Sequence, residues 1–357
     1  MLDMSATNTA TVPTDAELVA SCATVIDVPR AVPPDSFMLH APLELLARAI
    51  LLERAPSDTR VLARERLQWL ADKYAAAAPS ADPAPPAEDL DIDTTVSSLA
   101  AAGHAPILLS LRPRVPAAPL TFGARLVAME VARYPDWKLT WPATRRTAGP
   151  GSDDLAERLA APRSPGDPGS DFIYPTMHLT ETSGLAAEVL EEPLRGMGVE
   201  EARRILLRAA AQSMLQDNRD AAPYGWTHCL TMPQAVLVAA ENGADPDLAI
   251  AVAATYVLGF RSTQGRVRLD PSWSPARDTA VGSVWWAPDD ELPSIVSGIV
   301  SYGVIHPDAH VAKYTLACLD AAEADPDASR LFLAAAAHLH AWWRPVPFDE
   351  DPILGRV

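Results

Sequence analysis

Apolar residues recur at intervals of three and four over most of this chain, and that spacing restricts what it can fold into. The segment that follows His40 has it, and so does the segment that begins at Asp58, which is placed to cap a helix. Two consecutive segments of this kind predict an antiparallel helical hairpin. Similar segments continue as far as Trp343, whereas alternating runs typical of strands are scarce. The sequence therefore predicts a mainly α protein, a single large multi-helical domain with long irregular loops.

Composition sets the expected limits of that domain. Residues 1–35 begin with small polar side chains and are predicted to be a flexible N-terminal tail, residues 36–345 the helical domain, and residues 346–357 a C-terminal tail. Two segments rich in Pro, Gly and Asp, near 77–93 and 147–171, interrupt the helical pattern. Such segments have too few apolar side chains to pack, so we expect surface loops there.

Charge and hydropathy disfavour two classes of partner. The formal net charge is -17 and no run of Lys or Arg exceeds two residues, so neither nucleic acid nor an anionic membrane surface is an expected partner. The longest apolar run, residues 248–260, is shorter than the ~20 residues that cross a bilayer. We expect a small-molecule partner instead, and a homodimer is compatible with the sequence.

The cysteines and the N-terminal residues indicate in which cellular compartment the protein is expected. Cys22, Cys229 and Cys318 are odd in number and widely scattered, without the paired spacing of a disulfide framework or a zinc finger. The first residues lack the basic start and apolar core of an export signal. The expected location is cytoplasmic.

Common catalytic motifs are missing from the sequence. It has no GxGxxG, no GxxxxGK[ST], no GxSxG and no HExxH. Dinucleotide-binding, P-loop, α/β-hydrolase and zincin functions therefore have no motif to support them. The remaining signal lies in the placement of histidines.

One helix near the C-terminus combines histidine with lysine. It is predicted to begin at Pro307, with His306 at its cap and with His310 and Lys313 as neighbours on its surface, three residues apart. The structural alternative is that Lys313 shares a solvated stripe with Asp320, seven residues further on. The spacing alone leaves both interpretations open.

Other histidines also lie beside apolar residues and are candidate metal ligands. Neutral imidazole offers a lone pair at physiological pH, so three or four of these rings in a helical core would hold Fe, Mn, Zn or Cu. The pattern does not show which of them converge, and a hydrogen-bonded core histidine is the commoner case. The candidates are His40, His178, His228 and His310, with His104 and His306 as substitutes.

Four segments together resemble the questin oxidase-like family. They are HCLTMPQAV at residues 228–236, the stretch that begins AHVAKYTLACLD at residue 309, LHAPLELLARAILL around His40, and MHLTETSGLAAEVLEEPL around His178. The similarity extends from about residue 36 to about residue 340 through short, degenerate motifs.

The resemblance implies an oxidoreductase that uses O2 to oxidise or cleave a ring of an anthraquinone-type aromatic polyketide. Some members of the family hold a non-heme iron with four histidines and a carboxylated lysine. Carried onto this chain, the resemblance makes His310 and Lys313 catalytic and gives Fe(II), with Zn or Mn as alternatives, the following ligands: His40, His178, His228, His310 and the carbamate of Lys313. Tyr224, Trp226 and Tyr314 flank these positions and are expected to line a substrate pocket.

Two alternatives to an oxygenase remain at this stage. A zinc-dependent hydrolase or lyase would use the same histidines without redox chemistry, and a metal-free helical binding protein would use none of them. Within the oxygenase hypothesis, a mono- and a dioxygenase outcome are equally compatible with the sequence.

Overall fold

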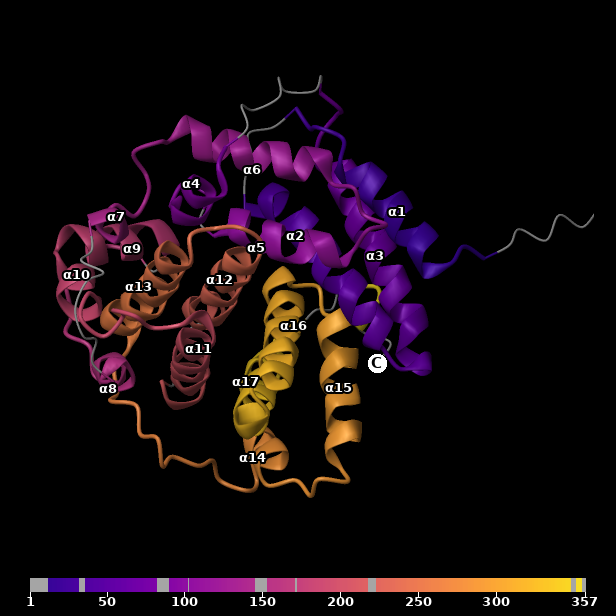
Figure 1. The fold of residues 1–357 in the computed structure, drawn as a ribbon. Helices are drawn as coiled ribbons and strands as arrows, with labels where there is room; N and C mark the ends of the chain where they lie inside the picture. The colour runs from indigo at the N-terminus through magenta and orange to yellow at the C-terminus, as the bar shows by residue number, and fades with distance from the viewer. Residues whose placement is uncertain are drawn as a thin grey trace, which may run out of the picture.

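The computed structural model describes residues 12–31, 36–81, 90–101, 103–144, 153–170, 172–217, 223–347 and 351–354. Within these ranges the chain forms 17 α-helices and two 3₁₀ turns. The same ranges hold no strand, only two isolated antiparallel bridges, Arg30 with Ser80 and Ser98 with Lys138. The predicted mainly α class is confirmed (Figure 1).

The helices differ widely in length, and the longest ones form the body of the protein. In chain order they are α1 (Asp15–Ile26), α2 (Ser36–Arg54), α3 (Ser57–Ala77), α4 (Ile92–Ser97), α5 (His104–Leu111), η1 (Arg112–Arg114), α6 (Thr121–Arg133), α7 (Trp141–Thr144), α8 (Leu155–Ala160), α9 (Ile173–Thr182), α10 (Leu185–Leu190), α11 (Val199–Gln216), α12 (Tyr224–Glu241), α13 (Pro246–Gln264), α14 (Ala280–Trp285), α15 (Leu292–Ile305), α16 (Ala309–Ala324), η2 (Pro326–Ala328) and α17 (Ser329–Trp343).

Part of the predicted N-terminal tail is helical instead. The Thr14 side chain accepts from the backbone N–H of Glu17, whose carboxylate accepts from the backbone of Thr14, and this capping box starts α1. Leu18, Cys22 and Ile26 then repeat at helical spacing and are buried, and α1 packs against α3. The prediction of a tail over residues 12–31 was therefore wrong. Residues 1–11 and 32–35 lie outside the described residues.

The predicted C-terminal tail and second loop also hold packed residues. Asp351 accepts two hydrogen bonds from the buried guanidinium of Arg66, and Ile353 is buried. In the loop near 147–171, Leu155 and Leu159 of α8 are fully buried. Both predictions missed these anchors. Of the two loops predicted to lie on the surface, residues 82–89, 145–152 and 171 are outside the described residues.

Four helices close a ring at the centre of the fold. Helix α2 packs against α5, α5 against α12, α12 against α16, and α16 against α2. Figure 1 shows these four helices around the centre of the molecule. Side chains from all four helices can therefore reach one common region.

The close approach of α5 to α12 depends on a glycine. Gly103, the N-cap of α5, has φ of +80°, a conformation that L side chains rarely adopt. A Cβ at this position would also collide with the Met232 side chain on α12. The glycine therefore lets the first residue of α5, His104, lie directly against α12.

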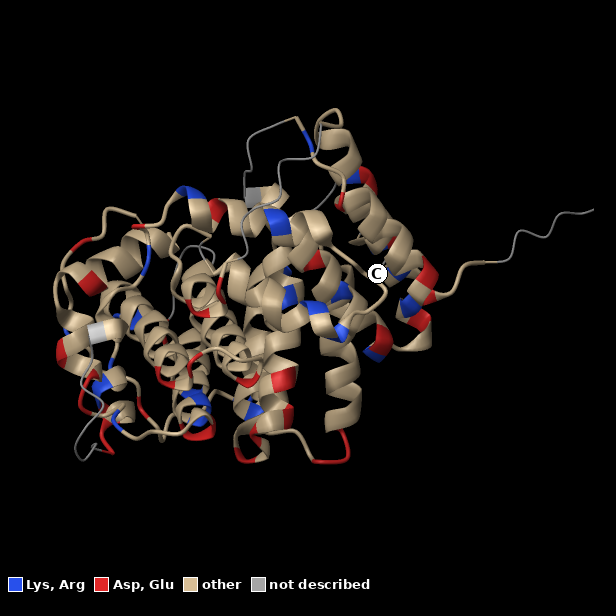
Figure 2. Ribbon diagram, turned by 45° about the horizontal axis from the view of Figure 1, so that its top comes forward, with Lys and Arg blue, Asp and Glu red and all other residues tan. Residues whose placement is uncertain are grey.

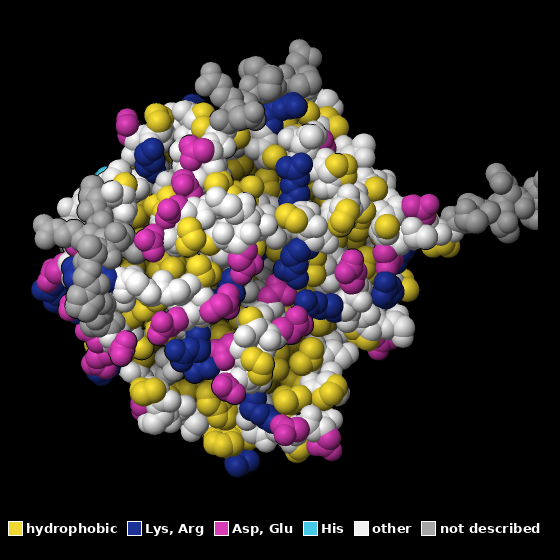
Figure 3. Space-filling model, viewed as in Figure 1, with side chains coloured by type: hydrophobic (Ala, Val, Ile, Leu, Met, Phe, Trp, Pro, Cys, Tyr) yellow, Lys and Arg dark blue, Asp and Glu magenta, His cyan; other side chains and the backbone are white. Residues whose placement is uncertain are grey.

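The surface carries charged side chains of both signs. Acidic and basic side chains are interspersed over the ribbon in Figure 2 and over the face in Figure 3, with no large basic patch. Among the helices that the structure describes, none is both long enough and apolar enough to cross a membrane.

Candidate functional site

Each helix of the central ring contributes one histidine to a single cluster. His40 comes from α2, His104 from the first turn of α5, His228 from α12 and His310 from the first turn of α16. The ring centres of His104 and His40 are 4.7 Å apart, those of His40 and His310 4.7 Å, and those of His310 and His228 5.0 Å. The four imidazoles are therefore consecutive neighbours.

The start of α16 differs from the prediction and positions His310. Asp308, not His306, caps the helix, which begins at Ala309 rather than at Pro307, and its carboxylate accepts from the backbone N–H of His310 at 2.7 Å. The same carboxylate oxygen lies 3.0 Å from Nδ1 of His310, and the hydroxyl of Tyr224 donates to the other oxygen at 2.8 Å. Asp308 thus fixes both the helix end and the imidazole.

Two of the four histidines have their tautomer set by an acceptor. Nδ1 of His104 contacts the carbonyl oxygen of Ala101, which can only accept, so this nitrogen carries the hydrogen. Nδ1 of His310 donates to the Asp308 carboxylate for the same reason. In both rings the lone pair is left on Nε2, and a second-sphere acceptor on the other nitrogen is the usual arrangement of metal-ligating histidines.

Burial keeps the imidazoles neutral. It lowers the pKa of His104 to about 3 and lowers the pKa values of His40, His228 and His310 below their usual range, with Lys313 and the neighbouring rings acting in the same direction. Neutral rings at pH 7 are the form that donates a lone pair to a metal. The cluster is therefore ready to act as a donor set.

Lys313 lies next to this cluster and is almost completely buried. Its side chain is 5% exposed, and Nζ is 3.5 Å from Nδ1 of His40. Burial lowers the pKa of Lys313 to about 8, although the carboxylates of Asp308 and Glu44 counteract it. The alternative of a solvated stripe is excluded, because Asp320 pairs instead with Arg114 and Arg54.

Lysine is a rare residue in this chain, and Lys313 is one of the few. The chain has 29 Lys and Arg residues, and only three of them, Lys73, Lys138 and Lys313, are lysine. Lys313 is the buried one among the three. Lysine, unlike arginine, can lose its proton inside a protein and become a nucleophile.

Two buried arginines hold the turn between α15 and α16 in place. Arg48 donates to the carbonyl oxygens of Val304 and His306 and pairs with Glu44 at 2.5 Å, and Arg66 donates to that of Ile305. Helix ends leave carbonyls without intrahelical partners, so these side chains satisfy a buried helix C-terminus. The sequence analysis missed this support for Asp308.

Three predicted residues do not lie at the cluster. His178 is exposed on α9 and stacks on Tyr174, with ring centres 5.4 Å apart, so His104 occupies the place that it was expected to take. Trp226 and Tyr314 are fully buried and do not line the cleft described below. Tyr224 does not line that cleft either, but its ring centre lies 4.6 Å from that of His310.

His306 belongs to a separate buried group. Its ring lies 5.2 Å from that of Tyr302 and 5.4 Å from that of Trp343, and its Nδ1 accepts from the backbone N–H of Asp308. The nearby His340 bonds Thr315 through Nε2 at 2.8 Å. Both are structural core histidines.

The cluster is not a finished metal site as it stands. In the described part of the chain, no three or more His, Cys, Asp and Glu side chains are arranged so that they could hold a metal ion. The imidazoles are neighbours without pointing at one common position. Any ion would require these rings to turn.

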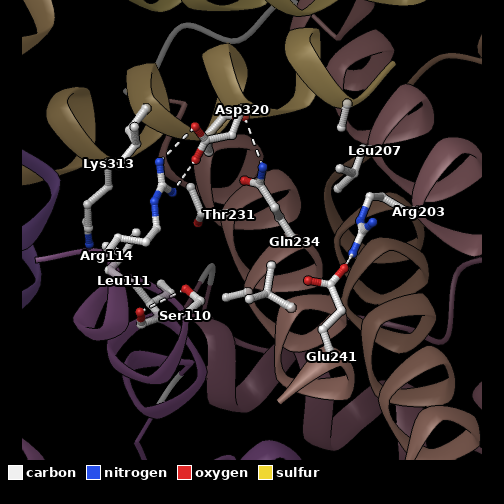
Figure 4. A pocket seen from close by; sticks show the side chains of 16 residues that line it. Ser110, Leu111, Arg114, Arg203, Leu207, Thr231, Gln234, Glu241, Lys313 and Asp320 are labelled. Atoms are coloured by element: carbon white, nitrogen blue, oxygen red, sulfur yellow. Dashed lines mark hydrogen bonds and ion pairs between the residues drawn. The ribbon is translucent and has the colours of Figure 1, made fainter. Parts of the chain in front are cut away.

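A cleft of about 250 Å³ leads from the surface to Lys313. It lies between α5, α11, α12 and α16, and in Figure 4 Lys313 extends from α16 towards α5 at one end of it. Lys313 is the member of the candidate site that lines it. The lysine therefore lies both at the cleft and next to His40.

Comparison with known proteins gives no assignment. No protein-family model, curated protein or solved structure matches the chain. The resemblance to the questin oxidase-like family stays a prediction.

Proposed function

We propose that this protein is a metal-dependent oxygenase whose metal is held by His40, His104, His228 and His310, with Lys313 as an additional ligand. One observation carries the proposal. Four packed helices each contribute one neutral imidazole, and consecutive imidazoles are neighbours. A single buried lysine lies beside them. Structural histidines are usually buried singly, each with its own hydrogen-bond partner.

The spacing of the rings fits a common metal. A metal–nitrogen bond of about 2.0–2.1 Å puts the centre of a ligating imidazole roughly 3.2 Å from the metal, so two such rings whose metal–nitrogen bonds make an angle of about 90–110° have centres roughly 4.5–5.2 Å apart. The observed separations of 4.7, 4.7 and 5.0 Å lie in this range. A shared metal would require the Nε2 atoms to turn towards one point.

Lys313 suits conversion to a carbamate. With a pKa of about 8, a fraction of its amine is neutral at physiological pH. The nitrogen lone pair attacks the carbon of CO2, a C–O π bond opens to give a carboxylate, and the nitrogen releases a proton to solvent. The cation becomes an anionic oxygen ligand and its burial is offset by the metal charge.

The donor set favours iron, and zinc is the alternative. Imidazole suits iron, zinc and copper, and an added carboxylate oxygen suits harder ions such as iron(II) and manganese(II). Iron(II) held in this way would supply the reaction with O2, whereas zinc would support a hydrolase or lyase at the same residues.

The chain's own residues would orient the ligands and exclude water. Asp308 holds His310 by its Nδ1 hydrogen and is itself held by Tyr224. Hydrogen bonds from His310 and Tyr224 outweigh the effect of burial and keep the pKa of Asp308 well below its usual value, so the carboxylate is charged. A charged partner raises the basicity of the imidazole and its affinity for a metal.

The substrate proposed from the sequence is a small aromatic molecule of polyketide type, oxidised by mono- or dioxygenation. Its support is the apolar cleft that ends at Lys313. The three buried, unpaired thiols suit a reducing compartment, and we propose a cytoplasmic location on that ground.

A metal-free helical binding protein is the second candidate, and one observation favours it. The imidazoles do not converge in the described residues, and the lysine amine stands beside them. This candidate predicts ligand binding in the cleft and no tight metal binding.

Equilibrium dialysis against iron(II) under anaerobic conditions, with bicarbonate present, separates these functions. We expect the parent protein to bind about one iron per chain. His178→Ala should retain this iron, and His104→Ala and His228→Ala should each lose most of it. The exposed His178 is the matched control, and far-UV circular dichroism verifies that each variant is folded. Equal iron in all three variants, or none in the parent protein, would refute the proposed centre. Preferential zinc binding would favour the hydrolase or lyase.

A further inference from the structure

The cleft beside Lys313 has a consistent chemical character. Most of its wall is apolar and comes from four helices: Ile107 and Leu111 on α5, Leu207 on α11, Ala235 and Val238 on α12, and Leu316 and Ala317 on α16. At about 250 Å³ it is just below the size of pockets for drug-sized ligands, about 300–1,000 Å³. Its size and lining suit a small, largely apolar molecule.

Apart from Lys313, the charged residues of the cleft are already neutralised in pairs. Arg114 is bonded to Asp320, which also pairs with Arg54 at 3.1 Å, and Arg203 is bonded to Glu241 (Figure 4). An anionic ligand would have to separate one of these pairs or reach the buried amine of Lys313. The rim therefore does not select for a charged ligand.

The uncharged polar groups of the wall present mainly hydrogen-bond acceptors. The hydroxyl of Ser110 donates to the carbonyl of Ile107 at 2.9 Å, and that of Thr231 donates to the carbonyl of Thr227 at 3.0 Å. Each oxygen keeps its lone pairs but has spent its hydrogen. The amide nitrogen of Gln234 donates to the carbonyl of Ala317 at 3.2 Å, which leaves its oxygen as a third acceptor.

We propose that the cleft is a binding site for a small, uncharged, hydroxyl-bearing apolar molecule, whose hydroxyl groups donate to Ser110, Thr231 and Gln234. A ligand seated there contacts the stem of Lys313, so as a substrate site the cleft rests on the function proposed above. As a ligand site it is independent of the metal, and it is tested without one.

Equilibrium dialysis of metal-free protein with three related probes tests the ligand class. The probes are β-naphthol, its methyl ether, which lacks the donated hydrogen, and β-naphthoate, which is an anion. We expect β-naphthol to bind once per chain and roughly tenfold more tightly than the ether, since its one donated hydrogen bond is lost, and naphthoate to bind most weakly. Equal binding of β-naphthol and its ether, or preference for naphthoate, would overturn the proposal.

Variants locate the binding. Val238→Trp should fill the cleft and abolish β-naphthol binding, because Val238 lines it and is only partly buried. Ser110→Ala combined with Thr231→Val should weaken β-naphthol roughly tenfold and leave the ether unchanged. Ser213→Ala is the control, since its hydroxyl also bonds a helical carbonyl but lies outside the cleft lining.

Two results place the binding elsewhere: unchanged affinity in folded Val238→Trp, or an equal loss in Ser213→Ala and the double variant. If Val238→Trp does not fold, the affinity of the double variant alone tests whether β-naphthol binds in the cleft. Failure to bind iron would refute the proposed function and leave this result standing, and failure to bind β-naphthol would do the reverse.

Discussion

Replacing Lys313 with Met should stabilise the metal-free protein. The side chain is 5% exposed, and burial lowers the pKa of its amine from 10.5 to about 8. One pKa unit corresponds to about 1.4 kcal/mol, so at pH 7 the folded state carries an unfavourable contribution of about 3 kcal/mol from this charge. Methionine has a similar length and no charge, and Lys313→Met removes that contribution.

The effect should depend on pH in a specific direction. Between pH 8 and 10.5 the unfolded chain holds the lysine proton and the folded chain has released it, so raising the pH favours folding of the parent protein. The advantage of Lys313→Met should therefore be full below pH 8, decline by about 1.4 kcal/mol per pH unit, and vanish near pH 10.5.

Urea unfolding followed by far-UV circular dichroism, in carbonate-free buffer at several pH values, measures this difference. Lys138→Met is the matched control, because Lys138 lies partly exposed at the surface and its replacement should change the free energy of unfolding little. A Lys313→Met variant that is no more stable than the parent at pH 7, or a difference that does not change up to pH 10, would refute the burial argument.

Three further predictions follow from the site and its support. Acid should destabilise the metal-free protein below pH 6.5. Burial lowers the pKa values of histidines such as His104 in the folded state, so only the unfolded chain takes up protons on them. A urea midpoint that stays constant from pH 7 to pH 5 would contradict this. Arg48→Leu should cost about 3–5 kcal/mol of unfolding free energy in the same urea assay, since it leaves Glu44 charged and unpaired in the core, and a loss below about 1 kcal/mol would argue against a tight pair. In ¹³C-bicarbonate, NMR should show one carbamate resonance that is absent from Lys313→Met, and a resonance that survives in the variant would assign the carbamate to another amine.

The helical class was predictable because it depends on local spacing. The same reasoning could have found α1, since Thr14 and Glu17 have the spacing of a capping box and buried apolar residues follow at helical intervals. The anchor between Arg66 and Asp351 is different. It joins residues 285 positions apart, and nothing in either segment indicates the other.

The candidate site was predictable only in part. His310 and Lys313 are three residues apart on one helix, so their proximity follows from sequence. The meeting of His40, His104 and His228 follows from the packing of four helices, which no spacing encodes.

The misplacement of His178 has a visible signal. Ile173, Met177 and Thr180 form the buried face of α9, and a residue directly after Met177 points away from that face. For His104 the signal was the preceding Gly103, whose positive φ and lack of a side chain place the ring against α12.

The central claim is that four imidazoles and Lys313 hold one metal, and a crystal of iron-loaded protein measured at the iron absorption edge tests it most directly. The account predicts one anomalous peak within about 2.0–2.2 Å of ring nitrogens of His40, His104, His228 and His310, with carbamate density extending from Nζ of Lys313 to the same peak. No peak at this position, or a peak at the exposed His178, would contradict it.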